Sequence, residues 1–361
     1  MPMKRIALVA TTALALWPMA AMAAEVPEGY DASYADILSA AEEEGSVVVY
    51  GTTDSSAVEP LLSGFQDKFG IEVEYHDLNS LKLFNRVISE TAAGVGTGDV
   101  VWSSAMDLQA KLIDDGFATE YVSQEDGSVP DWAKWKGAYG VTVEPAAIMY
   151  NTRLVPEEDV PSTRAEFAEL LREKADTYAD KVVTYDPETA GVGFLFMSQD
   201  AAQSDGIWDL VRAMADAKLK LSASSGGQIE RVASGEYLFS YNIIGSYVLA
   251  QQAGNEALGL VFPEDYTLTF SRIAFISSGA KHPNAAKVFL DYMLSAEGQE
   301  KLADEFLGSV RDDVEYDALA DAKGNLKPIP INEDLLTYLD QQKRLDFLKT
   351  WTDALRGGSA D

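Results

Sequence analysis

Short apolar segments alternate with longer amphipathic segments along most of this chain, and this alternation limits the fold more than any other feature. Runs of consecutive or alternating apolar residues are typical of β-strands, whereas apolar residues three and four apart indicate surface helices. We expect strands at Ser46–Tyr50, Ile71–His76, Asp99–Ser103, Lys181–Tyr185, Tyr237–Tyr241 and Leu258–Phe262. Because strands joined by helices form parallel pairs through right-handed crossovers, the sequence predicts an α/β fold.

Helices are expected between these strands. Val58, Leu61 and Phe65, for example, lie on one helical face, and Gly70 ends that helix. We expect helices at Tyr34–Glu44, Ala57–Phe69, Leu83–Ala93, Asp107–Asp115, Ala165–Tyr178, Ile207–Ala217, Pro283–Met293 and Glu297–Phe306, another from Gly245, and a mostly helical tail from Pro328 to Leu355. Strand–helix–strand units therefore occur in both halves of the chain.

The length of the chain favours two lobes. Its 361 residues exceed the roughly 250–300 that one hydrophobic core usually serves. Two extended stretches, Ala138–Tyr150 with Pro145 inside it and Phe270–Ile276, are suited to cross between lobes. We expect each lobe to be a mostly parallel sheet flanked by helices, with a hinge between the lobes. The expected first lobe is residues 25–144 and 268–312, and the second is residues 145–267 and 313–361 with the C-terminal helices.

Residues 1–24 have the layout of a cleavable secretory signal peptide. Lys4 and Arg5 precede the apolar run Ile6–Met19, and small residues follow at Ala21 and Ala23. The apolar run is shorter than the about 20 residues that a membrane-spanning helix needs. We therefore expect the chain to be exported and released from the membrane.

The net charge excludes several classes of partner. The chain has 58 acidic and 28 basic residues, a formal net charge of −30. Such a charge repels nucleic acids and anionic membrane surfaces, so we expect neither nucleic-acid binding nor stable membrane insertion. The chain contains no cysteine, so its core must hold without disulfides.

Residues suited to catalysis or to metal binding are few. His76 and His282 are the two histidines, and a zinc site needs more histidine or cysteine ligands than these. No G-x-S-x-G motif of a hydrolase nucleophile is present. The sequence thus predicts a protein that is not an enzyme and needs no cofactor or metal, and a secreted hydrolase is the alternative from a different class.

Four polar segments follow predicted strands, where open α/β sheets bind ligands. They combine hydroxyl groups, glycines and the backbone N–H groups of helix starts, which together suit an organic anion. The candidate ligand-binding residues are Thr52, Thr53, Asp54 and Ser55; Ser103 and Ser104; Thr189, Ala190 and Gly191; and Tyr241, Asn242, Ser246 and Tyr247. Helix capping or a plain loop is the alternative role of these segments.

Arg272 is a further candidate, because it interrupts the otherwise apolar strand Phe270–Ile276. A guanidinium group matches the geometry of a carboxylate or a phosphate. The alternative is an internal salt bridge, which the acidic excess of the chain favours.

The segment Lys281–Gln299 resembles a segment of family 1 extracellular solute-binding proteins, and in particular their ferric-iron and AfuA-like subgroup. Val47–Tyr50, Ala147–Asn151 and Gly191–Gly193 match the same family in the same order. The resemblance implies a type II periplasmic binding protein fold and a monomer in the periplasm. It also implies the substrate-binding protein of an ABC transporter, which captures a small polar solute by hinge closure and delivers it to an inner-membrane permease.

The resemblance also bears on the ligand. Ferric-binding members carry adjacent tyrosines just after the strand that corresponds here to Tyr237–Tyr241, and this chain has Asn242 and Ile243 there. A phosphorylated or carboxylated small molecule is therefore favoured over ferric iron, which stays an alternative.

A polyamine or another cation is a second alternative, because the chain is acidic. Such a ligand would need carboxylates in the cleft, for which Asp54, Asp186 and Glu144 are candidates.

Overall fold

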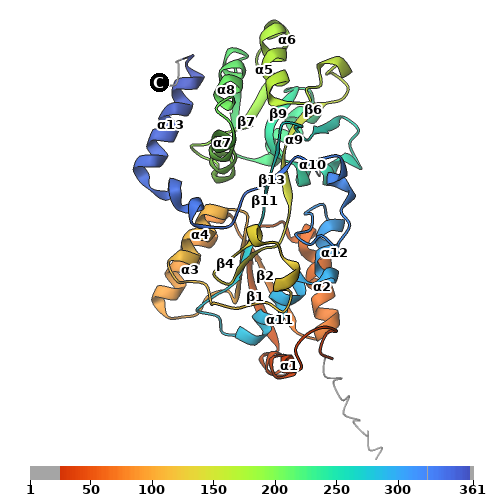
Figure 1. Ribbon diagram of the computed structural model, residues 1–361, viewed down its shortest axis with the longest axis vertical. Coiled ribbons are helices and arrows are strands. Elements are labelled where there is room, and N and C mark those ends of the chain that lie inside the picture. Colours follow the sequence, from red (N-terminus) through yellow and green to blue (C-terminus); the bar gives the residue numbers. More distant parts are fainter. Residues whose placement is uncertain (1–24, 323, 358–361) are drawn as a thin grey trace, which may run out of the picture.

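The structure is a computed structural model that describes residues 25–322 and 324–357. The expected signal peptide, residues 1–24, lies outside the described residues. The described chain forms two lobes stacked along the long axis of the molecule, each built around one β-sheet with flanking helices (Figure 1). The predicted two-lobe α/β fold is thereby confirmed.

The first sheet has the strand order β2-β1-β3-β12-β5-β4. Its strands are β1 (Ser46–Gly51), β2 (Glu72–Asp77), β3 (Val100–Ser103), β4 (Lys134–Trp135), β5 (Ala138–Gly140) and β12 (Ile273–Ile276). Strand β1 lies between β2 and β3 and is parallel to both, as expected for strand–helix–strand units. The remaining pairs are antiparallel. Strand β12 returns from the second lobe to lie between β3 and β5, and β4 and β5 are consecutive in the chain.

The second sheet has the order β13-β11-β6-β9-β7-β8, and β10 also pairs with β6. Its strands are β6 (Glu144–Asn151), β7 (Val182–Tyr185), β8 (Lys220–Ser222), β9 (Phe239–Ile244), β10 (Leu258–Val261), β11 (Thr267–Phe270) and β13 (Leu326–Pro328). Three pairs that include β6 are antiparallel. Both sheets are therefore mixed, whereas mostly parallel sheets were expected, because the strands that continue from the lobe crossings run against their neighbours.

Helices cover both sheets. Those of the first lobe are α1 (Tyr34–Glu44), α2 (Ser55–Phe69), α3 (Ser80–Ala93), α4 (Met106–Asp114), α11 (Pro283–Leu294) and α12 (Ala296–Asp304). Those of the second lobe are α5 (Arg164–Glu173), α6 (Ala175–Tyr178), α7 (Gly191–Gln203), α8 (Ile207–Asp216), α9 (Ser225–Ala233), α10 (Gly245–Gln252) and α13 (Gln341–Leu355). Short 3₁₀ segments lie at Asp126–Ser128, Asp131–Ala133, Glu157–Asp159, Asp317–Ala322 and Glu333–Leu339.

Two crossings between the lobes lie side by side. The first is residues 141–143, between β5 and β6, and the second is residues 271–272, between β11 and β12. The N–H of Val141 donates to the carbonyl of Arg272 at 2.9 Å, and the N–H of Arg272 donates to Oγ1 of Thr142 at 2.8 Å. The crossings therefore form one hydrogen-bonded connection on which the lobes can turn.

The second crossing differs from the sequence prediction. One strand was expected over Phe270–Ile276, returning to the first lobe from residue 268. The structure instead has β11 paired with β6 in the second sheet and β12 paired with β3 in the first. Ser271 and Arg272 separate the two strands because both bond to the first crossing rather than to a sheet.

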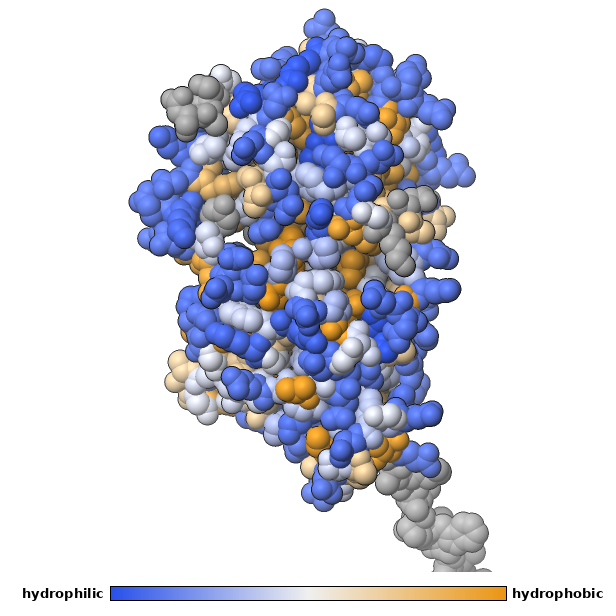
Figure 2. Space-filling view, viewed as in Figure 1, coloured by the Kyte–Doolittle hydropathy of each residue, from blue (hydrophilic) through white to orange (hydrophobic). Residues whose placement is uncertain are grey.

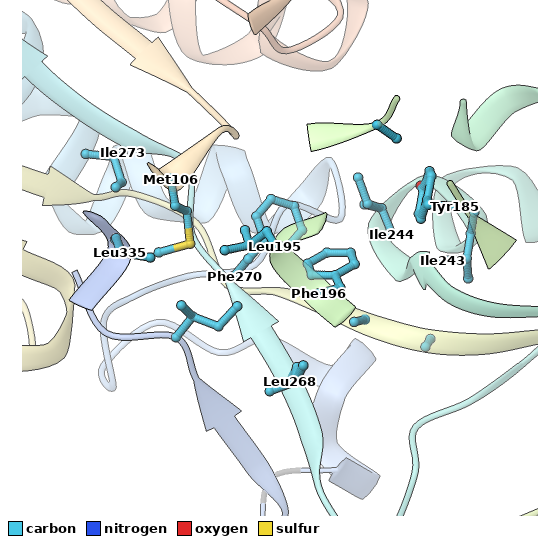
Figure 3. Packing of buried hydrophobic residues seen from close by; sticks show 14 of the residues in the cluster. Met106, Tyr185, Leu195, Phe196, Ile243, Ile244, Leu268, Phe270, Ile273 and Leu335 are labelled. Carbon is cyan, nitrogen blue, oxygen red and sulfur yellow. The ribbon is translucent and has the colours of Figure 1, made fainter. Parts of the chain in front are cut away.

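Apolar packing holds each lobe and also joins them. One cluster of buried residues lies in the first lobe and another in the second. A further cluster contains Met106 of α4, Leu195 of α7, Leu335 of the C-terminal segment and Phe270 of β11, which lie close together in Figure 3. Because each fully buried large apolar side chain contributes about 1.5–3 kcal/mol, this cluster ties the lobes together on the side of α4 and α7.

The surface is mainly hydrophilic, with apolar residues visible where the two lobes meet (Figure 2). Within residues 25–322 and 324–357, no helix is both long and apolar enough to cross a membrane.

Candidate functional site

A pocket of about 450 Å³ lies between the two lobes. The first lobe contributes the start of α2 and the segment just after α12, with Asp54, Ser56, Ala57, Glu305 and Leu307. The second lobe contributes the starts of α9 and α10, with Ser225, Gly226, Ile229, Ser246, Tyr247, Ala250 and Gln251. The pocket therefore has one wall from each lobe.

The first turns of three helices, α2, α9 and α10, line this pocket. The first N–H groups of a helix have no partner within the helix, and they form the positive end of its dipole. No side chain caps the start of α2 or of α10, whereas Oγ of Ser224 accepts from the N–H of Gly227 in α9. The backbone of α2 and α10 thus offers donors that suit a bound anion.

Two glycines shape the second-lobe wall. A Cβ atom at Gly245 would lie 2.8 Å from Cγ of Pro145, so this glycine lets α10 begin directly against β6. A Cβ atom at Gly226 would meet no atom within 4 Å, because Gly226 faces open space in the pocket. The first position needs glycine for packing, and the second leaves room for a ligand.

A buried ion pair connects the lobe crossings to this pocket. Nε of Arg272 lies 2.7 Å from Oε1 of Glu144, and Nη2 lies 3.0 Å from Oε2. The carboxylate of Glu144 also accepts from Oγ1 of Thr142 at 3.0 Å and from Oγ of Ser246 at 2.7 Å. The internal salt bridge that was the alternative for Arg272 is therefore present.

Arg272 also contacts both lobes directly. Its Nη1 donates to the carbonyl of Thr52 at 3.3 Å, and its Nη2 donates to the hydroxyl of Tyr247 at 3.0 Å. Burial alone would lower the pKa of Arg272, but the charge of Glu144 and the hydroxyl of Tyr247 raise the pKa above its usual value. The guanidinium therefore stays charged and links the first-lobe loop to α10.

The sequence over residues 61–328 matches the family of bacterial extracellular solute-binding proteins. The structure of the substrate binding protein of the ABC transporter from Agrobacterium tumefaciens is 36% identical, with a TM-score of 0.78 over 86% of this chain and 94% of that chain. This chain belongs to the extracellular solute-binding protein family. None of the curated proteins matches its sequence.

More distant structures have the same fold as this solute-binding protein. Iron-bound HitA from Pseudomonas aeruginosa is 18% identical, with a TM-score of 0.68 over 86% of this chain and 99% of that chain. The periplasmic binding protein AfuA from Actinobacillus pleuropneumoniae, with fructose-6-phosphate bound, is 19% identical, with a TM-score of 0.68 over 87% and 99% of the two chains. At these identities the likeness shows the fold alone.

Three of the candidate residues line the pocket of this solute-binding protein, namely Asp54, Ser246 and Tyr247. Ser55 begins α2 beside Asp54 and is exposed. Thr52 lies deeper, where its Oγ1 accepts from the N–H of Ser104 at 3.0 Å and so joins the loops after β1 and β3.

The other candidates from these segments do not line the pocket. Thr53 is fully buried, and Oγ of Ser103 accepts from the N–H of Ala105 at the start of α4. Thr189 is exposed and its Oγ1 donates to Asp186 at 2.9 Å. Ala190 and Gly191 form the start of α7, where a plain loop was the alternative.

Tyr241 and Asn242 lie inside β9 rather than after it. The strand was expected to end at Tyr241, but it continues to Ile244 because Ile243 and Ile244 pair with Ala147 and Ala146 of β6. The prediction that this strand ends at Tyr241 was therefore wrong, because β9 continues through Asn242 to Ile244. The error placed Tyr241 and Asn242 at a strand end beside the ligand. The residues that follow the true strand end are those at the start of α10.

Both side chains belong to a buried polar network of the second lobe. The hydroxyl of Tyr241 accepts from Nε of Arg164 at 2.8 Å and donates to Oδ2 of Asp200 at 2.7 Å. Nδ2 of Asn242 donates to the same Asp200 oxygen at 2.6 Å. Neither residue is among those that line the pocket, and both bond to Asp200 within the second lobe.

The sequence prediction did not include helix α9, and it did not identify Glu305 and Leu307, just after α12, as pocket-lining residues. Ser224, Ser225, Gly226 and Gly227 precede the apolar pair Ile229 and Val232, and a serine before such a pair indicates a helix start. This pattern could have identified Ser225 and Gly226. Nothing local to Glu305 or Leu307 indicates that they reach the pocket, because the fold of α12 against α2 places them there.

The described residues offer no metal site built from side chains of histidine, aspartate or glutamate in groups of three or more. Among the described tyrosines, Tyr247 alone lines the pocket. A pair of neighbouring tyrosines, as expected for ferric-binding members of the family, is thus not part of its lining.

Proposed function

We propose that this protein is the substrate-binding component of a bacterial ABC importer, located in the periplasm as a monomer. It captures a small organic anion between its lobes and delivers it to an inner-membrane permease without changing it chemically. The observation that carries this proposal is the meeting of three helix starts at one pocket between the lobes.

The pocket supports capture of a small solute. Its volume of about 450 Å³ falls in the roughly 300–1,000 Å³ range of small-molecule sites. Because its walls belong to different lobes, a solute that contacts both walls favours the closed arrangement over an open one. Closure about the paired crossings then distinguishes the loaded protein from the empty one.

The chemistry of the lining supports an anionic group on the solute. The starts of α2 and α10 line the pocket, and Tyr247 is among the lining residues. AfuA with fructose-6-phosphate bound shares the fold, and the relative from Agrobacterium tumefaciens is described as the binding protein of an ABC transporter. The phosphorylated sugar bound by AfuA is in line with an anionic solute, and the relative from Agrobacterium tumefaciens supports a role in an ABC transporter.

The lining also supports binding without a reaction. Its serines, Ser56, Ser225 and Ser246, have no histidine or lysine among the pocket-lining residues to act as a base. Oγ of Ser246 instead donates to Glu144, which is already paired with Arg272. A hydrolase would need an activated nucleophile at this position.

Identification of the solute tests the proposal. Small molecules released from purified protein are analysed by mass spectrometry, and each candidate is then added back in a thermal-shift measurement. We expect a phosphorylated or carboxylated compound, and we expect it to raise Tm because it binds the folded state alone.

Two glycine variants connect that binding to the pocket. Gly226→Phe fills open space in the pocket, whereas Gly127→Phe places the same side chain in open space outside it. We expect the released compound to raise the Tm of Gly127→Phe as much as that of the wild type. We expect it to leave the Tm of Gly226→Phe unchanged. Stabilisation by ferric ion alone, or equal binding by both variants, contradicts the proposal.

A further inference from the structure

The first-lobe wall of the pocket carries two carboxylates without a cationic partner. Asp54 is exposed at the start of α2, and Glu305 is half-buried just after α12. Neither side chain forms a hydrogen bond or an ion pair with the described residues. By contrast, Glu144 beneath the pocket is neutralised by Arg272.

The second-lobe wall has the opposite character. The first turns of α9 and α10 direct the positive ends of their dipoles to the pocket. The hydroxyl of Tyr247 accepts from Nη2 of Arg272, so its own proton stays available for a ligand oxygen. No lysine or arginine is among the pocket-lining residues.

The first-lobe wall also contains the start of α2, but Asp54 is the residue at that start, and its carboxylate offsets the positive end of the helix dipole. The two walls therefore differ in charge, because carboxylates lie on the first wall and helix starts without a carboxylate lie on the second. A solute with an anionic group alone satisfies α9, α10 and Tyr247 but meets like charge at Asp54 and Glu305. A solute with a cationic group alone satisfies the carboxylates but leaves the helix starts without an acceptor. A solute that carries both groups satisfies both walls at once, because opposite charges attract and like charges repel.

We infer that the solute is a zwitterion with a carboxylate or a phosphate at one end and a protonated amine at the other. The anionic end binds at the starts of α9 and α10, and the amine binds between Asp54 and Glu305. This inference rests on the proposed function, since it assigns the chemical class of the solute. It also explains closure, because one small molecule then joins the two lobes through opposite charges.

Matched compounds test the need for the amine. Phosphoethanolamine is compared with ethyl phosphate and ethanolamine, and γ-aminobutyrate is compared with butyrate and butylamine, by thermal shift and calorimetry. We expect at least one of the two amino compounds, phosphoethanolamine or γ-aminobutyrate, to bind at least about tenfold more tightly than both of its single-charge counterparts. Whether the phosphate or the carboxylate series binds identifies the anionic group.

Neutral variants test the two carboxylates. In the double variant Asp54→Asn/Glu305→Gln, the amino compound that binds the wild type should lose at least about tenfold in affinity. Its anionic counterpart should bind more tightly than to the wild type, because the repulsion is gone. The matched control is Asp36→Asn/Glu43→Gln on α1, whose exposed carboxylates lie outside the pocket and should leave both affinities unchanged.

The outcomes separate this inference from the proposed function. If ethyl phosphate or butyrate binds as tightly as its amino counterpart, the zwitterion is overturned and capture of an anion stands. Equal binding of the amino compound by the double variant and the wild type also overturns it, as does failure of both amino compounds to bind. If, in addition, purified protein releases no solute at all, the proposed function fails as well.

Discussion

The guanidinium of Arg272 and the carboxylate of Glu144 form a bidentate ion pair at the point where the two lobe crossings lie side by side. The exposed fraction of the two side chains is 1% and 0%. Through Tyr247 and Ser246 the pair also reaches the wall of the pocket. The connection between the lobes and the lining of the pocket therefore belong to one hydrogen-bonded network.

Removal of Arg272 should strongly destabilise the protein. Arg272→Met leaves the Glu144 carboxylate buried without a cationic partner, which should lower the free energy of unfolding by about 3–5 kcal/mol. Urea unfolding followed by circular dichroism measures this loss. The double variant Arg272→Met/Glu144→Leu should recover part of it, because no unpaired charge remains.

A surface ion pair provides the control for Arg272. Lys136→Met removes the pair with Asp114, whose side chains are 47% and 42% exposed, and should cost at most about 1 kcal/mol. If Arg272→Met lowers the free energy of unfolding no more than Lys136→Met does, the buried pair does not stabilise the crossings.

Asn242 should matter for stability and not for solute affinity. Its φ of 56° lies in the left-handed region, and its Nδ2 donates to Asp200. Asn242→Ala loses this bond and strains the backbone, so the free energy of unfolding should fall by about 1–3 kcal/mol. Asn242→Gly should cost less, because glycine adopts this φ without strain.

Chemical unfolding and calorimetry with the identified solute separate the two roles of Asn242. A large loss of solute affinity at unchanged stability would restore Asn242 as a ligand contact, as its position in the sequence suggested.

Asp291 should make the stability of the first lobe depend on pH. Its carboxylate accepts from the hydroxyls of Tyr34, Tyr121 and Ser123 and from the N–H of Gln124. No cation is among the groups that shift its pKa, and burial raises the pKa despite the hydrogen bonds that lower it.

The sign of this dependence follows from the raised pKa. A carboxyl group whose folded-state pKa is raised stabilises the fold below its unfolded-state pKa of about 3.9, and this contribution is lost as pH rises through the folded-state value. The unfolding free energy of the wild type relative to Asp291→Asn should therefore fall as pH rises through that value. Denaturant unfolding of both proteins across this pH range measures the difference, and a difference that is constant or rises with pH would contradict the prediction.

The apolar cluster between the lobes should contribute to their joint stability. Leu335→Ala removes a side chain that is 5% exposed and packs near α4 and α7, at an expected cost of about 2–5 kcal/mol. Leu345→Ala, at a residue that is 62% exposed, should stay within about 0.5 kcal/mol of the wild type.

Hydrogen exchange gives a second measurement of this cluster. In Leu335→Ala, amide protection should fall in α4 and α7 together, because both helices lose the same contact. Loss confined to the C-terminal segment would show that Leu335 does not join the lobes.

Local sequence predicts the elements whose ends are set by local chemistry. Helix α1 has the expected bounds, Tyr34–Glu44, because Gly45 adopts a φ of 71° and terminates it. Helix α7 was not predicted, because Phe194–Met197 are all buried and show no apolar period along one face. The end of β9 was misplaced since the pairing with β6, rather than local sequence, extends it to Ile244.

The candidate site was predicted in part for the same reason. Asp54, Ser246 and Tyr247 follow strands of the two sheets, and the rule that ligands bind beyond strand ends identifies them. Ser225 reaches the pocket from a helix that follows the edge strand β8, and Glu305 reaches it from the end of α12. Whether such residues line the pocket depends on how the two lobes face each other, and no local sequence pattern specifies this arrangement.

A crystal structure of the protein with its co-purified solute gives the sharpest test of capture between the lobes. The solute should lie between Asp54 at the start of α2 and Ser225 at the start of α9, in contact with both lobes. A solute bound to one lobe alone, or bound outside this pocket, would contradict it.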